Sequence, residues 1–178
     1  MKKQLLQQRT HSQTYSKTVY KTAQGIEKRY KFLTDGYIQQ VKFVLENFQL
    51  YFPYKFSYTL NMPDCVIKQT LVKSTQSFDT VDLDTYIDLA QQLIKDLQQD
   101  DSWYWSVVNM QKEENIFLVD NRLVLVDESK TVPYADLNLA KLTSAQGILQ
   151  GIINLAPDEF DFVSVCERVA QAVDGAYT

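Results

Sequence analysis

Residues 108–127 read VNMQKEENIFLVDNRLVLVD, and this segment says more about the architecture than any other in the chain. Two short apolar runs, residues 116–119 and 123–126, lie on either side of Asp120 and Asn121, a pair typical of a tight hairpin turn. Asn115 precedes the first run and Asp127 follows the second. The segment therefore predicts a short hairpin over residues 116–126 with a polar side chain at each end.

The chain before this segment has the pattern of strands around one helix. Two strands are expected between residues 14 and 32, on either side of Gln24 and Gly25. A helix should follow, because four apolar residues step by three, four and three: Ile38, Val41, Leu45 and Phe48. Residues 54–60 alternate in polarity and residues 61–64 favour a turn, so a second hairpin is expected with residues 65–72 as its returning strand.

Helical spacing dominates after a polar connector at residues 73–77. Asp82 suits the N-cap of a helix that ends near residue 98. Two helices should close the chain, the first carrying Ile148 and Ile152, and the second starting near Pro157 with an apolar stripe of Phe162, Cys166, Val169 and Val173. We therefore expect a mobile N-terminus at 1–13, an N-terminal lobe of strands and one helix at 14–76, and a C-terminal helical lobe at 77–178 that contains the hairpin.

The composition is that of a globular protein. Of the 178 residues, 45% are hydrophobic and 22% are charged, which allows a packed core. The formal net charge is −4 and the basic residues are scattered, so nucleic acid is not an expected partner. No apolar run approaches the ~20 residues that cross a bilayer, and the first residues are too polar for a signal peptide. We therefore expect a soluble, cytosolic chain.

Several catalytic chemistries lack their residues. His11 is the only histidine, so Ser-His-Asp and Cys-His arrangements are not expected. Neither Cys65 nor Cys166 has a second Cys or His at ligand spacing, which argues against zinc. A disulfide between these cysteines is one alternative, and two buried thiols in a reducing compartment is the one that we favour.

The order of elements resembles that of a protein kinase: a small sheet with one helix, a polar hinge, a helix, and a hairpin entered by an Asn. The kinase catalytic loop reads His-Arg-Asp and then Leu, Lys, Pro, Glu, Asn, and Lys112, Glu114 and Asn115 match its second part. Met110 stands at the position of the catalytic Asp, and a thioether cannot accept the proton of a substrate hydroxyl. The resemblance implies an α+β, two-lobed, kinase-like fold without the general base.

The residues for nucleotide and metal are equally degenerate. Asp127 resembles the metal-binding Asp of Asp-Phe-Gly, but Glu and Ser follow it, and we favour Asn115 and Asp127 as turn residues rather than metal ligands. No glycine precedes Gly25, so a Gly-rich turn for phosphate is missing. Lys21 or Lys28 could supply a strand lysine for phosphate, although we expect both to be exposed strand residues. No catalytic, metal or cofactor-binding residue and no cofactor is therefore assigned.

With its neighbours, this degenerate loop resembles the N-terminal cytosolic domain of the EssB (YukC) family, a membrane component of the type VII secretion machinery of Gram-positive bacteria. The likeness rests on the strand-helix-strand opening and on three segments: residues 113–121 (EENIFLVDN), 132–134 (VPY) and 156–160 (APDEF). It covers the chain from about Tyr20 to its end, and Glu113 departs from the Pro that the family often has. The resemblance implies a pseudokinase that acts as a cytoplasmic domain of a cell-membrane protein, with a single membrane-spanning helix beyond Thr178. It also implies homodimers of the full-length protein, and as partners the membrane-bound ATPase and small helical WXG-type substrates.

We therefore expect a non-catalytic interaction or scaffold domain of this machinery. Five aromatic residues are candidate partner contacts, with a place in the core as the alternative: Tyr51, Phe52, Trp103, Tyr104 and Trp105. A second hypothesis is an atypical metal-dependent phosphotransferase of kinase-like fold, with Asn115 and Asp127 on the metal and Glu113 or Glu114 as base. A third is an adaptor or immunity protein with a generic α+β fold.

Overall fold

The computed structural model describes residues 3–11, 15–32, 34, 39, 42–44, 46–47, 56–61, 63–98, 103–108, 110, 115–127, 131–153, 155 and 161–178. The fold is mixed α+β, and the chain divides into two compact units. Residues 1–72 form the sheet unit and residues 73–178 form the helical unit.

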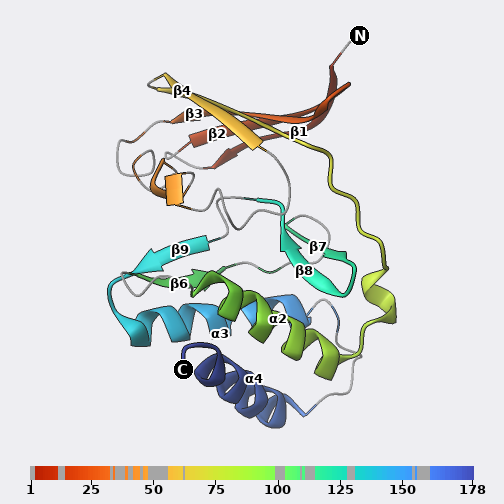
Figure 1. Ribbon diagram of the computed structural model, residues 1–178, viewed down its shortest axis with the longest axis vertical. Helices are drawn as coiled ribbons and strands as arrows, with labels where there is room; N and C mark the ends of the chain where they lie inside the picture. The colour runs from red at the N-terminus through yellow and green to blue at the C-terminus, as the bar shows by residue number, and fades with distance from the viewer. Residues whose placement is uncertain are drawn as a thin grey trace. The chain divides into compact units, whose positions relative to one another are not determined.

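The sheet unit is built on five antiparallel strands (Figure 1). These strands are β1 (Gln4–His11), β2 (Tyr15–Thr22), β3 (Gly25–Phe32), β4 (Phe56–Asn61) and β5 (Asp64–Gln69), and they lie in the order β1-β2-β3-β5-β4. Both predicted hairpins, β2–β3 and β4–β5, are confirmed by their registers. Of the predicted helix, the described residues 39, 42–44 and 46–47 are helical, whereas the four residues of its expected stripe lie outside the described residues.

Gly25 sets the geometry of the β2–β3 turn. Its φ of 140° is one that side-chain-bearing residues rarely adopt. A Cβ at this position would also lie 2.1 Å from the carbonyl oxygen of Gln69 on β5. Glycine is therefore required here both by the backbone conformation and by the close approach of the neighbouring strand.

Strand β1 corrects the expectation of a mobile N-terminus at residues 1–13. Gln4–His11 pairs with β2 from Gln4 opposite Lys21 to His11 opposite Tyr15, with a bulge between Leu5 and Gln7. Most of the described side chains of this strand are exposed, so its main-chain hydrogen bonds, rather than an apolar face, hold it in the sheet. A polar edge strand of this kind leaves no hydrophobic period in the sequence.

One face of the sheet forms the core of the sheet unit. Tyr15, Tyr30, Cys65 and Ile67 are all buried, and the rings of Tyr15 and Tyr30 lie 5.7 Å apart between centroids. Both cysteines of the chain are free thiols, as expected, but Cys166 in the helical unit is only partly buried.

In the helical unit, a run of short strands lies in sequence between the helices α2 and α3. Its elements are the 3-10 helix η1 (Phe78–Thr80), α2 (Leu83–Leu97), β6 (Tyr104–Val107), β7 (Ile116–Val119), β8 (Arg122–Leu125), β9 (Thr131–Tyr134), α3 (Leu137–Ile153) and α4 (Phe162–Ala176). Strand β6 pairs with β9 and β7 pairs with β8, both antiparallel. In Figure 1, α3 runs beside the β6–β9 pair, and α4 packs against α2 and α3. The sequence did not predict β6 or β9.

An Asp side chain caps the start of each of the helices α2, α3 and α4, and in α3 it is Asp136 that accepts from the Leu139 amide. The predicted N-cap Asp82 accepts a hydrogen bond from the Thr85 amide at 2.7 Å, and this bond holds the pKa of Asp82 below its ordinary value. Helix α4 begins at Phe162 rather than near Pro157, because Asp161 accepts hydrogen bonds from the Val163 and Ser164 amides. Residues 156–160 lie outside the described residues.

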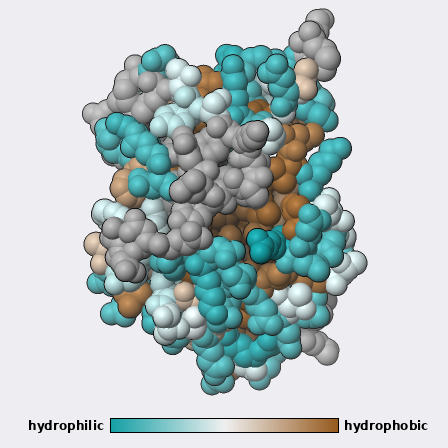
Figure 2. Space-filling view, viewed as in Figure 1, coloured by the Kyte–Doolittle hydropathy of each residue, from teal (hydrophilic) through white to brown (hydrophobic). Residues whose placement is uncertain are grey.

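Much of the surface in the lower part of Figure 2 is hydrophilic (teal). At the start of α4, however, Phe162 and Val163 are 58% and 65% exposed, so the prediction that Phe162 belongs to a buried apolar stripe is wrong. On α2, Asp84, Asp88, Gln92 and Lys95 are exposed, while Tyr86, Ile87, Ala90, Ile94 and Leu97 are buried. Among the residues that the structure describes, no helix combines the length and the apolar character needed to span a membrane.

Candidate functional site

The β7–β8 hairpin is the structural centre of the candidate site. Ile116 lies opposite Leu125 and Val119 lies opposite Arg122, so only Asp120 and Asn121 remain in the turn. Their φ angles are 50° and 59°, which define the left-handed two-residue turn that suits the twist of paired strands. Asp and Asn tolerate this conformation better than most residues, so the predicted turn is confirmed.

The connector at residues 74–76 binds along the edge of this hairpin. The Thr75 amide donates to the Leu118 carbonyl at 2.9 Å, and the Leu118 amide donates to Ser74 Oγ at 3.2 Å. Thr75 Oγ1 accepts from the Asp120 amide at 2.8 Å. The Gln76 side chain bonds both the amide and the side chain of Asn121. The predicted connector is thus part of the helical unit and satisfies one edge of β7.

Asn115 and Asp127 lie at the same, open end of the hairpin. The Asn115 carbonyl accepts from the Val126 amide at 2.9 Å, which brings the backbone of Asn115 beside the residue that precedes Asp127. Asn115 is 4% exposed and Asp127 is half-buried. Within the described ranges, no cluster of three or more His, Cys, Asp and Glu side chains is suited to a metal ion. The other candidate residues of the catalytic-loop segment, Lys112, Glu113 and Glu114, lie outside the described residues.

Met110 is a buried residue. Its side chain is fully inaccessible, and its carbonyl oxygen accepts a hydrogen bond from the Tyr86 hydroxyl at 3.2 Å. A Cβ on Gly151 of α3 would lie 2.1 Å from that hydroxyl and 2.5 Å from the Met110 carbonyl, so α3 approaches the loop closely only because residue 151 is glycine. Burial raises the pKa of Tyr86 far above its ordinary value, and the hydroxyl stays a donor at any ordinary pH.

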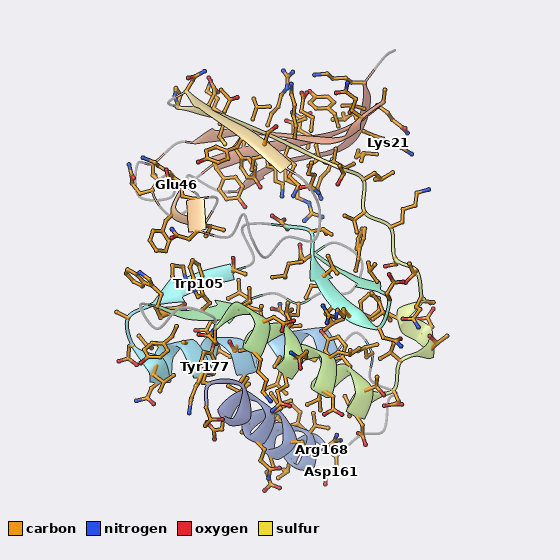
Figure 3. All side chains as sticks on the ribbon, viewed as in Figure 1. Lys21, Glu46, Trp105, Asp161, Arg168 and Tyr177 are labelled. Carbon is orange, nitrogen blue, oxygen red and sulfur yellow. The ribbon has the colours of Figure 1, made fainter. Side chains whose placement is uncertain are left out.

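The two candidate strand lysines differ in environment. Lys21 is exposed, as predicted, and is labelled in Figure 3. The prediction for Lys28 is wrong, because this residue is only 4% exposed. Lys28 lies two positions from the buried Tyr30 on β3, and alternation along a strand places both side chains on the same face. The burial of Lys28 is therefore a feature of the candidate site that the sequence reasoning missed.

The aromatic cluster of β6 divides between core and surface. Trp105 is 4% exposed and belongs to the core, while Tyr104 is half-buried and Trp103 is 38% exposed. Of the candidate partner contacts, Trp103 is therefore the most accessible among the described residues. Tyr51 and Phe52 lie outside the described residues.

Tyr177 fixes the C-terminal end of α4 to this cluster. Its hydroxyl donates to the Trp105 carbonyl and lies 2.9 Å from Ser144 Oγ of α3 (Figure 3). Since the hydroxyl has a single proton, Ser144 acts as the donor in the second bond. Burial raises the pKa of Tyr177 to about 12, although the bond from Ser144 opposes that shift. This buried network was not foreseen from the sequence.

The chain was also compared with known proteins. It matches no protein-family model and no curated protein sequence. The class that the fold defines is a mixed α+β protein with a five-stranded antiparallel sheet unit and a helical unit that carries a short hairpin. Its function is therefore inferred from the residues themselves.

Proposed function

We propose that this chain is a non-catalytic interaction domain of kinase-like fold, acting as a scaffold in the EssB/YukC membrane component of a type VII secretion machine. The observation that carries the non-catalytic part is the environment of Met110. A general base must reach the substrate hydroxyl, whereas the side chain at this position is an inaccessible thioether.

The order of elements supports a kinase-like arrangement. Three consecutive antiparallel strands lead into helical residues and then a two-stranded hairpin, and in the second unit a hairpin follows the candidate catalytic loop. Protein kinases carry their phosphate-binding lysine on the third strand, and Lys28 is on β3. The exposed ring of Trp103 supports a role in partner binding, because tryptophan is enriched among residues that anchor interfaces.

Two observations favour the phosphotransferase as a second candidate. The hairpin brings Asn115 and Asp127 to the same end, and these residue types hold metal ions in kinases. Lys28 adds a buried cation on the third strand. An enzyme built from these groups would need Glu113 or Glu114 to replace the missing base.

Calorimetry with Mg-ATP, with phosphate release measured in parallel, separates the two candidates. A scaffold should show no magnesium-dependent nucleotide binding and no ATP turnover. Turnover that disappears in both Asn115→Ala and Asp127→Ala, while Asn121→Gly retains it, would establish the phosphotransferase, because glycine keeps the positive φ of the turn. Asn121 is a suitable control because it lies at the opposite end of the same hairpin.

The family assignment has a separate test. The native gene should continue beyond Thr178 into an apolar stretch of ~20 residues. A stop codon at that point would argue against a membrane-anchored component without affecting the conclusion about Met110.

A further inference from the structure

The two units carry opposite charge. Residues 1–72 contain 11 Lys and Arg against 4 Asp and Glu, a formal net charge of +7. Residues 73–178 contain 7 against 18, a net charge of −11. The total of −4 conceals this separation, which is large enough to orient the chain near a charged surface.

Four of the 11 basic residues of the sheet unit lie on one sheet face, which we call the basic face. It is defined by Arg29 and Lys31 of β3 and Lys68 of β5, all exposed, together with Lys3 before β1. Strand alternation and register place these strand residues on the side opposite Tyr30, since Lys68 pairs with Glu27. The acids described on this face are Asp64 and Glu27.

Glu27 offsets one positive charge of the basic face, and it also fixes the positions of two of its cations. Its carboxylate is 5% exposed and accepts from Lys3 Nζ at 2.6 and 2.8 Å and from Arg29 Nε at 2.7 Å. Burial alone would raise the pKa of Glu27, but these hydrogen bonds outweigh it, and the pKa lies below its ordinary value. Both cations also lie over the Tyr20 ring, with Lys3 Nζ at 5.9 Å and Arg29 Cζ at 5.6 Å from its centroid. The two basic side chains are thus held in place rather than left to move independently.

Apolar side chains stand beside these cations at the β1 edge. Leu5 and Leu6 are 53% and 49% exposed. Leu5 pairs with Tyr20, which pairs with Glu27, so Leu5 shares the basic face, and Leu6 lies in the adjacent bulge. Fixed cations beside exposed leucines match a surface that offers both negative charge and hydrocarbon.

We propose that the basic face, with Leu5 and Leu6, binds the surface of an anionic lipid bilayer. This proposal rests on charge and exposure, not on the family resemblance. Nucleic acid fits less well, because exposed leucines gain nothing from a phosphate backbone, and Tyr20, beneath two cations, is not presented for base stacking.

The test uses the full chain and sedimentation with vesicles of phosphatidylcholine alone or of phosphatidylcholine mixed with phosphatidylglycerol. Binding should occur only with the anionic vesicles and should be lost at about 1 M salt, where the Debye length is about 3 Å. Lys31→Gln/Lys68→Gln should lower the partition coefficient roughly 30-fold. The matched control Lys73→Gln/Lys95→Gln removes the same charge from exposed positions of the helical unit and should not weaken binding.

A second measurement reports orientation. Brominated anionic lipid quenches the emission of a tryptophan that lies at the bilayer surface, so in Leu6→Trp the added emission should be quenched. Equal binding to neutral vesicles, equal losses in the two lysine pairs, no quenching of the emission added in Leu6→Trp, or tighter binding to a DNA duplex than to anionic vesicles would each overturn the proposal.

Discussion

The sheet unit and the helical unit bury different kinds of polar group. Among the described residues, the buried polar side chains of the sheet unit are Lys17, Glu27, Lys28 and Gln69, three of them charged at neutral pH, whereas those of the helical unit are Ser106, Asn115, Thr131 and Ser144, all uncharged. A buried charged side chain needs an interaction that offsets the loss of water. One example is Lys17, whose Nζ lies 5.3 Å from the centroid of the Tyr30 ring. The stability of the sheet unit should therefore be sensitive to pH and to substitutions that change charge. The stability of the helical unit should be more sensitive to substitutions that remove core volume.

The largest expected effect comes from removing core volume in the helical unit. Ile148 of α3 is fully buried, so Ile148→Ala should lower the free energy of unfolding by about 2–5 kcal/mol. Urea unfolding followed by tryptophan emission measures this directly, since both tryptophans lie in this unit. Ile153→Ala, on the same helix at a position that is 65% exposed, should change it by less than about 0.5 kcal/mol. Equal losses would mean that α3 packs differently from the structure.

Replacing the buried carboxylate of the sheet unit should have the next largest effect. Glu27→Gln loses charge-assisted hydrogen bonds to Lys3 and Arg29 and should cost about 1–2 kcal/mol at neutral pH, because both cations are partly exposed and regain water. The change should appear in the circular dichroism of the sheet. If the tryptophan transition shifts by as much, the contrast between the units fails.

The cost of Glu27→Gln should also depend on pH. The pKa of Glu27 is lowered in the folded state, so the unfolded chain binds more protons as the pH falls toward and below about 4.3. The stability that Glu27 contributes is present above this range and is lost as the pH falls through the folded-state pKa. Unfolding midpoints of wild type and Glu27→Gln should therefore converge in acid, and parallel curves would count against the ion pairs.

A smaller effect is expected at the Tyr86 hydroxyl. Tyr86→Phe removes the donor to the Met110 carbonyl and should cost about 1 kcal/mol, measured by urea unfolding. Tyr177→Phe is a useful comparison because its hydroxyl bonds both Trp105 and Ser144 and should cost more. If Tyr86→Phe left the free energy of unfolding unchanged, the hydrogen bond to the Met110 carbonyl would not contribute to stability.

The smallest effect should come from a surface ion pair in the helical unit. Arg168 of α4 pairs with Asp84 of α2, but the Asp84 side chain is 73% exposed. Arg168→Gln should change the free energy of unfolding by less than about 0.5 kcal/mol, measured by thermal unfolding. The small difference between wild type and variant should hardly change when salt is added.

The sequence predicted elements whose signals are local. The β2–β3 and β4–β5 hairpins, the β7–β8 turn and the N-cap of α2 follow from alternation, turn residues and a capping Asp. Strand β1 was missed because an edge strand can be polar on both faces. Strands β7 and β8 are as short as β6 and β9, but they are joined by a recognisable turn. Strands β6 and β9 were missed because their pairing joins segments separated by the whole β7–β8 hairpin, so no local turn signal links them.

The sequence identified residues of the candidate site but not whether their side chains are buried or exposed. The sequence brought Asn115, Asp127 and Met110 into one hypothesis, and only the three-dimensional structure shows that Met110 is inaccessible. For Lys28, the prediction relied on the usual exposure of lysine, although strand alternation puts Lys28 on the same face as the buried Tyr30. In the structure Lys28 is buried, as alternation requires. The opposite charges of the two units became apparent once the boundary between them was known.

The docked connector has a practical consequence for dividing the protein. A truncated chain that starts at Lys73 retains Ser74, Thr75 and Gln76 as the edge partners of β7. A chain that starts at Phe78 would leave main-chain groups of Leu118 and Asp120 without those partners. The exposed edge of β7 could then pair with a strand of another molecule. Residues 74–76, which the sequence suggests are only a connector, therefore belong to the folded helical unit.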